Sequence, residues 1–155
     1  MLTNFSEQDK VIVEKIQSYC LYQDRCLKEV KKKLNTLNTE KDLQLKIINY
    51  LVDSDYLNEE RFTKFFIQGK LRIKKWGKIK LKYELKSRGI DSITIDKYIN
   101  DISEHEYLSY FEEYSTNKIN FLKGTIDQKK RSFINYFMYR GWENNLIYKK
   151  LNEIN

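Results

Sequence analysis

One short arrangement of apolar and turn-forming residues occurs three times along the chain. In each copy an apolar residue is followed four positions later by Asn or Gly: Leu34 by Asn38, Leu85 by Gly89, and Phe137 by Gly141. The apolar residues lie 51 and then 52 positions apart. Asn and Gly most easily adopt the left-handed backbone that follows a helix end. This spacing therefore predicts that the chain repeats one helical unit three times.

The apolar positions around this turn keep the same offsets in every copy. Before the turn stand Val30, Leu81 and Phe133; after it come first Ile48, Ile99 and Leu151 and then Leu51, Ile102 and Ile154. A segment rich in rings precedes each copy, with the sets Ile16, Tyr19, Cys20, then Phe62, Phe65, Phe66, then Tyr107, Phe111, Tyr114. Spacings of three and four place each set on one helix face. Each unit therefore predicts three helices.

Composition supports an all-α fold, arranged as an elongated array of three tandem three-helix repeats. The 155 residues contain no proline, and 41% are hydrophobic and 14% aromatic, so each small bundle has large rings for its core. The predicted division is 1–56 for the first repeat, 57–103 for a basic central repeat, and 104–155 for the third.

No apolar stretch approaches the roughly 20 residues that span a bilayer, and Met1 to Lys10 lack the pattern of a secretion signal. We therefore expect a cytoplasmic protein without a membrane partner. Cys20 and Cys26, with the single histidine, cannot supply a four-ligand zinc site, and we expect both to be reduced thiols. The sequence predicts no metal, no cofactor and no catalytic residue.

Positive charge is concentrated in the centre of the chain. The segment from Lys64 to Arg88 contains ten basic residues against one acid, Glu84, whereas Asp101 to Glu113 contains five acids and no Lys or Arg. This asymmetry indicates a polyanionic or acidic partner. A solvated lysine-rich surface is the alternative, because lysines dominate exposed helix faces.

The predicted helix from Gly77 to Arg88 has an unusual distribution of side chains. Lys78, Lys82 and Lys86 recur every four residues beside an apolar strip of Leu81 and Leu85. Two further apolar residues, Ile79 and Tyr83, fall on the far side of this helix. Neighbouring repeats could cover them, which is the interpretation we favour, or they could dock a partner.

Several segments of the chain resemble the RecX family of RecA regulators. The resemblance rests on Asp55-Tyr56-Leu57-Asn58-Glu59-Glu60-Arg61-Phe62, Lys75-Trp76-Gly77 and Glu84-Leu85-Lys86-Ser87-Arg88-Gly89-Ile90. Tyr19-Cys20-Leu21 with Glu29-Val30 is similar to the family's opening helix pair, and Tyr139-Arg140-Gly141-Trp142 to its closing turn. The similarity spans approximately residues 15 to 154, with little likeness from Ser115 to Lys130. The family's tandem three-helix architecture is the one that the spacing predicts, and we expect the array to be elongated and curved.

This resemblance implies a regulator without catalysis of its own. Such a protein binds the RecA recombinase filament on single-stranded DNA and inhibits its ATPase, strand-exchange and coprotease activities; we expect a monomer that contacts DNA directly only weakly. Contacts to the partner or DNA are assigned to Arg72, Lys74, Lys75, Trp76, Lys78, Lys82, Lys86 and Arg88. Trp76 could be an exposed anchor or a buried link between repeats. Asn58 is expected to cap a helix, and Arg61 to be structural.

Three other classes of function compete with this one. An enzyme is disfavoured, because His105 stands alone and no glycine-rich phosphate loop is present. A stand-alone DNA-binding module is the leading alternative; without exposed Asn or Gln in the basic segment it would contact phosphates rather than read bases. The third class is a protein scaffold whose basic surface serves only solubility.

Overall fold

The computed structural model describes residues 1–155 and contains nine α-helices, two short 3₁₀ helices and no strand. Two 3₁₀ turns, η1 (Leu2–Asn4) and η2 (Leu151–Glu153), lie at the ends of the chain. The helices are α1 (Glu7–Tyr22), α2 (Leu27–Thr36), α3 (Lys41–Asp53), α4 (Glu59–Ile73), α5 (Lys78–Ser87), α6 (Ser92–Asn100), α7 (Glu104–Asn120), α8 (Ile126–Tyr139) and α9 (Asn144–Lys150).

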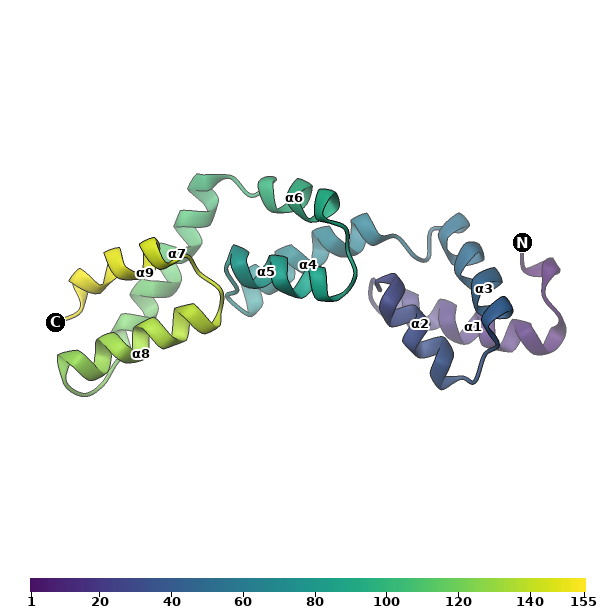
Figure 1. Cartoon of the computed structure of the whole chain (residues 1–155), viewed down its shortest axis with the longest axis horizontal. Coiled ribbons are helices and arrows are strands. Elements are labelled where there is room, and N and C mark those ends of the chain that lie inside the picture. Colours follow the sequence, from purple (N-terminus) through teal and green to yellow (C-terminus); the bar gives the residue numbers. More distant parts are fainter.

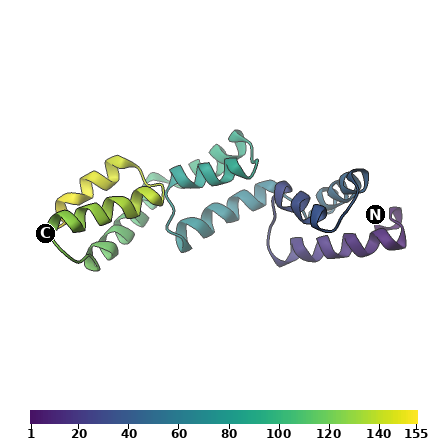
Figure 2. The same cartoon turned by 60° about the horizontal axis from the view of Figure 1, so that its bottom comes forward.

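The nine helices form three consecutive groups along an elongated, curved array (Figure 1). We call α1–α3 repeat 1, α4–α6 repeat 2 and α7–α9 repeat 3. The two chain ends lie at opposite ends of the molecule, and the view in Figure 2 retains the same order of repeats. Closely packed helix pairs such as α4 with α6 and α8 with α9 belong to one repeat. The predicted all-α array of three-helix repeats is confirmed.

The three turns predicted after the second helix of each repeat have the same geometry. Asn38, Gly89 and Gly141 have φ values of 51°, 79° and 78°. One residue beyond each, the backbone N–H of Thr39, Ile90 or Trp142 donates to the carbonyl of Leu34, Leu85 or Phe137, at 3.2, 3.2 and 3.1 Å. This bond is the long-range half of a Schellman motif, which satisfies a carbonyl left free at a helix end. The repeated sequence pattern is therefore a repeated helix stop.

Polar side chains begin most of the longer helices. Asn58 accepts a hydrogen bond from Arg61 N at 2.9 Å, so the expected cap of α4 is confirmed. Asp91 similarly caps α6 through Thr94 N. Each cap satisfies one of the backbone donors that have no partner inside the first helical turn.

Two hydrophobic cores lie inside the array, not three. Ten buried residues from Phe5 to Leu57 form the core of repeat 1. A second cluster of 17 buried residues runs through repeats 2 and 3 and also includes Cys26. Repeats 2 and 3 therefore share one core, whereas repeat 1 has its own.

One aromatic residue that we expected on a core face lies elsewhere. Phe62 is buried and Phe66 is partly buried, but Phe65 is 55% exposed. The core face of α4 is defined by Phe62, Thr63, Ile67 and Leu71, and Phe65 lies on the opposite side of that helix.

The two cysteines are free thiols inside the protein. Burial is the main cause that raises the pKa of Cys20 to about 11, and it also raises the pKa of Cys26. Both thiols are therefore protonated near neutral pH. None of the helices combines the length and the apolar character that a bilayer crossing requires.

Candidate partner-binding surface

The basic segment forms α4, α5 and the turn between them. Lys75 adopts a left-handed conformation with φ 57°, and Trp76 N donates to Lys70 O at 3.2 Å, which closes the end of α4. Gly77 then begins α5 as its N-cap. This sharp turn places the two basic helices of repeat 2 beside each other, as Figure 1 shows.

Repeat 3 holds this turn through its own helix stop. Gly77 N donates to Arg140 O at 2.8 Å, and Ile79 N donates to Gly141 O at 3.1 Å. A Cβ atom on Gly77 would overlap the carbonyl of Gly141, and one on Gly141 would overlap the backbone of Lys80. Because both residues lack a side chain, the start of α5 and the turn after α8 can touch through their backbones.

Aromatic side chains complete this junction. Trp142 is 1% exposed and stacks on Tyr107 with ring centroids 4.7 Å apart, and its Nε1 donates to Lys75 O at 2.8 Å. Tyr107 Oη accepts from Lys78 N at 2.9 Å and donates to Glu143 Oε2 at 2.7 Å. Burial is the main cause that raises the pKa of Tyr107. The hydroxyl remains protonated and keeps the donor role that this geometry requires.

The predicted contact residues divide between the two flanks of α5. On one flank, Lys78 Nζ lies 4.5 Å from the Tyr107 ring centroid, and Lys82 pairs with Asp96 at 3.4 Å. Lys86 is exposed and follows them on the helix. On the other flank, Arg88 binds Glu84 at 2.7 Å. The predicted set is therefore not one continuous stripe.

The remaining predicted residues surround the end of α4. Arg72 Nε donates to Tyr110 Oη at 3.1 Å, a bond that raises the pKa of Arg72. Lys75 Nζ lies 5.3 Å above the ring of Tyr114, whose pKa burial raises to about 12. Lys74 is exposed. These side chains face repeat 3 or solvent, so the cationic surface wraps around repeat 2.

A series of alternating cations and rings runs from Tyr139 of repeat 3 across repeat 2, and the sequence analysis missed two of its cations, Lys70 and Lys80. Lys80 Nζ lies 4.0 Å from the Tyr139 ring centroid and 4.9 Å from that of Trp76. Lys70 Nζ lies 5.3 Å from Trp76 and 5.5 Å from Phe66. Arg88 continues the series, with Cζ 4.8 Å from the Phe66 centroid. All these distances fall within the range of cation–π attraction.

In the sequence, Lys70 and Lys80 are evident only as part of the positive charge of the basic segment, not as neighbours of Trp76. Lys70 lies six residues before Trp76 and Lys80 four residues after it, whereas the periodicity of Lys78, Lys82 and Lys86 indicates only the other flank of α5. Trp76 itself is partly buried against the shared core. It is neither a fully exposed anchor nor the buried link between repeats, a position that Trp142 occupies.

The interpretation we favoured for Ile79 and Tyr83 is wrong. Ile79 is 55% exposed and Tyr83 is 70% exposed, so no neighbouring repeat covers them. The reason is geometrical: α5 buries Leu81 and Leu85 in the shared core, and the positions opposite this strip point outward from the array. The apolar side of α5 is therefore open, with basic side chains on both flanks.

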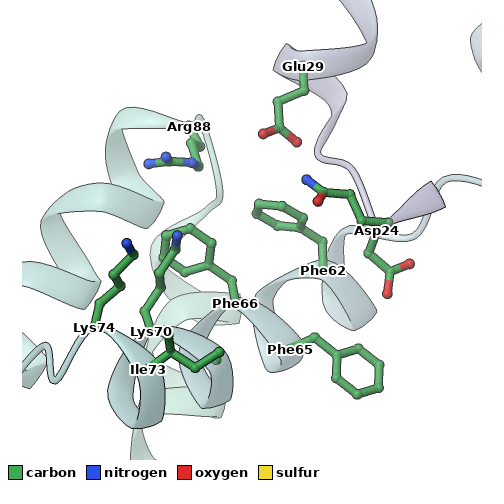
Figure 3. A pocket seen from close by; sticks show the side chains of 11 residues that line it. Asp24, Glu29, Phe62, Phe65, Phe66, Lys70, Ile73, Lys74 and Arg88 are labelled. Atoms are coloured by element: carbon green, nitrogen blue, oxygen red, sulfur yellow. The ribbon is translucent and has the colours of Figure 1, made fainter. Parts of the chain in front are cut away.

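An open groove separates repeat 2 from repeat 1. It has a volume of about 570 Å³ and is lined by α4 residues together with Asp24, Glu29 and Arg88. Figure 3 shows Lys70, Lys74 and Arg88 on one side of Phe66, with Glu29 and Asp24 on the other side of the groove. We call it the inter-repeat groove.

Arg61 of α4 links repeat 2 to repeat 1 beside the inter-repeat groove. Its Nε donates to Asp24 Oδ1 at 2.7 Å and its Nη1 to Asp55 Oδ2 at 2.9 Å. The hydrogen bond to Asp24 is the main cause that raises the pKa of Arg61. Hydrogen bonds from Asn58 and Arg61 lower the pKa of Asp55. The structural role expected for Arg61 is confirmed.

His105 is an exposed residue near the start of α7. It is therefore a residue on the surface of a helix.

A buried lysine lies in the same repeat. Lys150 is 4% exposed and pairs with Glu112 at 2.5 Å and with Glu153 at 2.8 Å. These pairs neutralise a buried ammonium group that would otherwise be costly. The charges in this part of repeat 3 are therefore mutually satisfied.

Comparison with known proteins identifies the same family as the sequence motifs. The family model described as the second three-helix domain of RecX matches residues 58–99. A protein named regulatory protein RecX from Clostridium acetobutylicum is 26% identical over 160 residues, covering 99% of this chain and 74% of its own length. The protein of the same name from Lactobacillus gasseri is 28% identical, and the match covers 66% of this chain and 38% of the relative.

Solved structures show the same fold. The crystal structure of RecX from Lactobacillus salivarius matches with a TM-score of 0.77 and 19% identity, and the match covers 97% of this chain and 98% of the other. A second crystal structure, of regulatory protein RecX, gives a TM-score of 0.79 at 13% identity, with 95% of this chain and 74% of the other covered. The fold is thus similar in these proteins although few of their residues are identical.

Proposed function

The chain is a member of the RecX family, and we propose that it regulates a RecA recombinase. It binds the RecA filament on single-stranded DNA and inhibits ATP hydrolysis, strand exchange and coprotease activity, and so modulates DNA repair and recombination. It acts in the cytoplasm, as a monomer and without catalysis of its own. The functional division follows the boundaries 1–56, 57–103 and 104–155, with the decisive contacts in the central unit.

The observation that carries this proposal is the unneutralised charge of repeat 2. Among the ten basic residues from Lys64 to Arg88, only Lys82 and Arg88 pair with a carboxylate. Unpaired cations on one section of an elongated molecule favour contact with acidic protein surface or with phosphates. The length of the array supports binding along a filament, because it spreads contacts over several neighbouring surfaces.

We assign the contacts to the eight predicted residues, and we add Lys70 and Lys80. Lys80 and Lys70 bracket Trp76, and cation–π attraction holds their ammonium groups near the ring. A side chain held in this way loses less conformational freedom when it binds. The exposed Ile79 and Tyr83 contribute apolar contact between the two basic flanks.

The experiment that tests this function is DNA-dependent ATP hydrolysis by RecA with this protein added below the RecA concentration. The wild-type chain is expected to slow hydrolysis, and the triple variant Lys78→Glu, Lys82→Glu, Lys86→Glu to inhibit less while its helicity is unchanged. A control with the same charge change in repeat 1, Lys31→Glu, Lys41→Glu, Lys46→Glu, should inhibit as the wild type does. Absence of inhibition by the wild-type chain at every ratio would refute the proposal.

The competing function is direct binding to DNA through phosphates, which the same cationic surface favours. The expectation that the basic segment exposes no Asn or Gln is wrong, because Gln68 is exposed on α4. In that case duplex binding without RecA should weaken steeply with salt, with a log–log slope near −0.9 for each phosphate neutralised. A flat salt dependence would eliminate this alternative and leave the inhibition assay to decide.

A further inference from the structure

Gly69 is a glycine that this chain alone does not need. It lies inside α4, where glycine destabilises a helix relative to alanine. Its φ is not positive, and a Cβ atom placed on it would meet no atom within 4 Å. A side chain would therefore fit without strain. Glycine at such a position permits another backbone to approach closely.

The surroundings of Gly69 are apolar and uncovered. Phe65 and Ile73 stand one helical turn to either side of it on the same face of α4, and they are 55% and 77% exposed. All three residues line the inter-repeat groove. Figure 3 shows both side chains on α4, with the ring of Phe65 directed away from Phe62 and Phe66. The groove therefore offers a flat central strip between two apolar side chains.

The free charge of the groove is positive. Lys70 and Lys74 line it and have no carboxylate within ion-pair distance. The acidic residues of the groove are already engaged: Asp24 accepts from Arg61, and Glu29 accepts from Cys26 N at 3.0 Å. An occupant that complements the groove thus brings carboxylates toward the lysines and apolar side chains toward α4.

We propose that the inter-repeat groove binds a polypeptide segment of the recombinase, one that presents apolar side chains flanked by carboxylates and packs its backbone over Gly69. This proposal rests on the proposed function, because it names the part of the partner that this surface receives. A polypeptide fits better than a nucleic acid, because apolar side chains can cover Ile73, which offers no ring for base stacking, while the backbone packs over Gly69.

The test is to fill the groove without harming the fold. Gly69→Leu places a bulky side chain over the central strip and improves helix propensity, so its thermal midpoint should not fall below that of the wild type. The matched control is Gln68→Leu, an exposed neighbour on α4 that does not line the groove. Binding to the RecA filament should weaken about tenfold or more in Gly69→Leu and remain unchanged in Gln68→Leu.

A second pair of variants tests the charge of the occupant. Lys70→Glu with Lys74→Glu should weaken filament binding more than Lys31→Glu with Lys41→Glu, which makes the same change in net charge on repeat 1. Both pairs should leave helicity at the wild-type level. Equal losses in the two pairs would contradict an acidic segment in the groove.

The outcomes separate this inference from the function on which it rests. If the wild-type chain binds and inhibits the filament and Gly69→Leu does so equally well, the groove proposal is wrong and the function stands. If the wild-type chain neither binds nor inhibits, both fall. If Gly69→Leu lowers the affinity for single-stranded DNA without RecA by the same factor, the occupant is nucleic acid and the polypeptide proposal is overturned.

Discussion

Repeat 2 is joined to repeat 3 by backbone groups and stacked rings, whereas it is joined to repeat 1 by charged side chains. At the first junction, Gly77 and Ile79 donate to repeat 3 carbonyls, and Trp142 lies inside a common core. At the second, Glu59 accepts from Leu27 N at 3.0 Å, and Lys28 Nζ donates to Ser87 O at 2.7 Å. Arg61 reaches Asp24 beside these contacts.

Three copies of one structural unit therefore form two kinds of junction, one through buried backbone contacts and the other through charged side chains. Buried backbone contacts tolerate little displacement, because a lost bond leaves an unsatisfied polar group. Ion pairs near solvent contribute little and can be replaced by water. We therefore expect repeats 2 and 3 to move as one body, and repeat 1 to change its angle to them. The inter-repeat groove lies at the joint that we expect to be the more mobile one.

The largest expected effect comes from Gly141→Ala. Its φ of 78° disfavours any side chain, and the new Cβ would overlap the backbone of Lys80. Together these effects should cost about 3 kcal/mol of unfolding free energy. Gly89→Ala is the matched control: it has the same φ but open space around its Cβ, and should cost about 1 kcal/mol. Urea unfolding measures both, and equal losses would show that repeat 3 does not dock through this glycine.

A smaller effect is expected from Arg61→Ala at the other junction. The substitution removes the bonds to Asp24 and Asp55 near solvent and should lower the global unfolding free energy by about 1 kcal/mol. Amide hydrogen exchange should become faster in repeat 1 and at the start of α4, and stay unchanged in α7 to α9. Faster exchange throughout repeat 3 would mean that the two joints are not independent.

The smallest effect is a response to pH at the same junction. Because the folded-state pKa of Asp55 is lowered from its ordinary value of 3.8, ionised Asp55 stabilises the fold fully above that value. The contribution is lost as the pH falls through the lowered pKa. Asp55→Asn, compared with the wild type by thermal unfolding between pH 7 and pH 3, should flatten the acid end of the stability profile slightly. If the variant and the wild type had the same stability profile, ionised Asp55 would not stabilise this junction.

The sequence predicted the helices better than it predicted their surfaces. Helix stops at Asn38, Gly89 and Gly141 could be read from the chain, because the left-handed conformation is a local preference of single residues. Phe65 and the pair Ile79 and Tyr83 were misplaced. Periodicity shows which residues share a helix face, but not which of two apolar faces meets another helix.

The candidate site shows the same limit. Its location in repeat 2 was evident from the charge between Lys64 and Arg88, which is a property of composition. The contacts of Lys70 and Lys80 with Trp76 depend on the left-handed turn at Lys75, and the groove exists only where α4 meets Asp24 and Glu29 of repeat 1. Spacing along one helix carries no information on either.

The sequence by itself determined three helical units, their stops and the basic character of the central one, because these follow from local backbone preference and from the order of side chains. Only the tertiary structure decided that repeats 2 and 3 share a core while repeat 1 keeps its own. That outcome depends on Gly77 meeting Gly141 across 64 residues of chain. Such a contact exists only when both turns are folded and aligned, so neither local sequence specifies it.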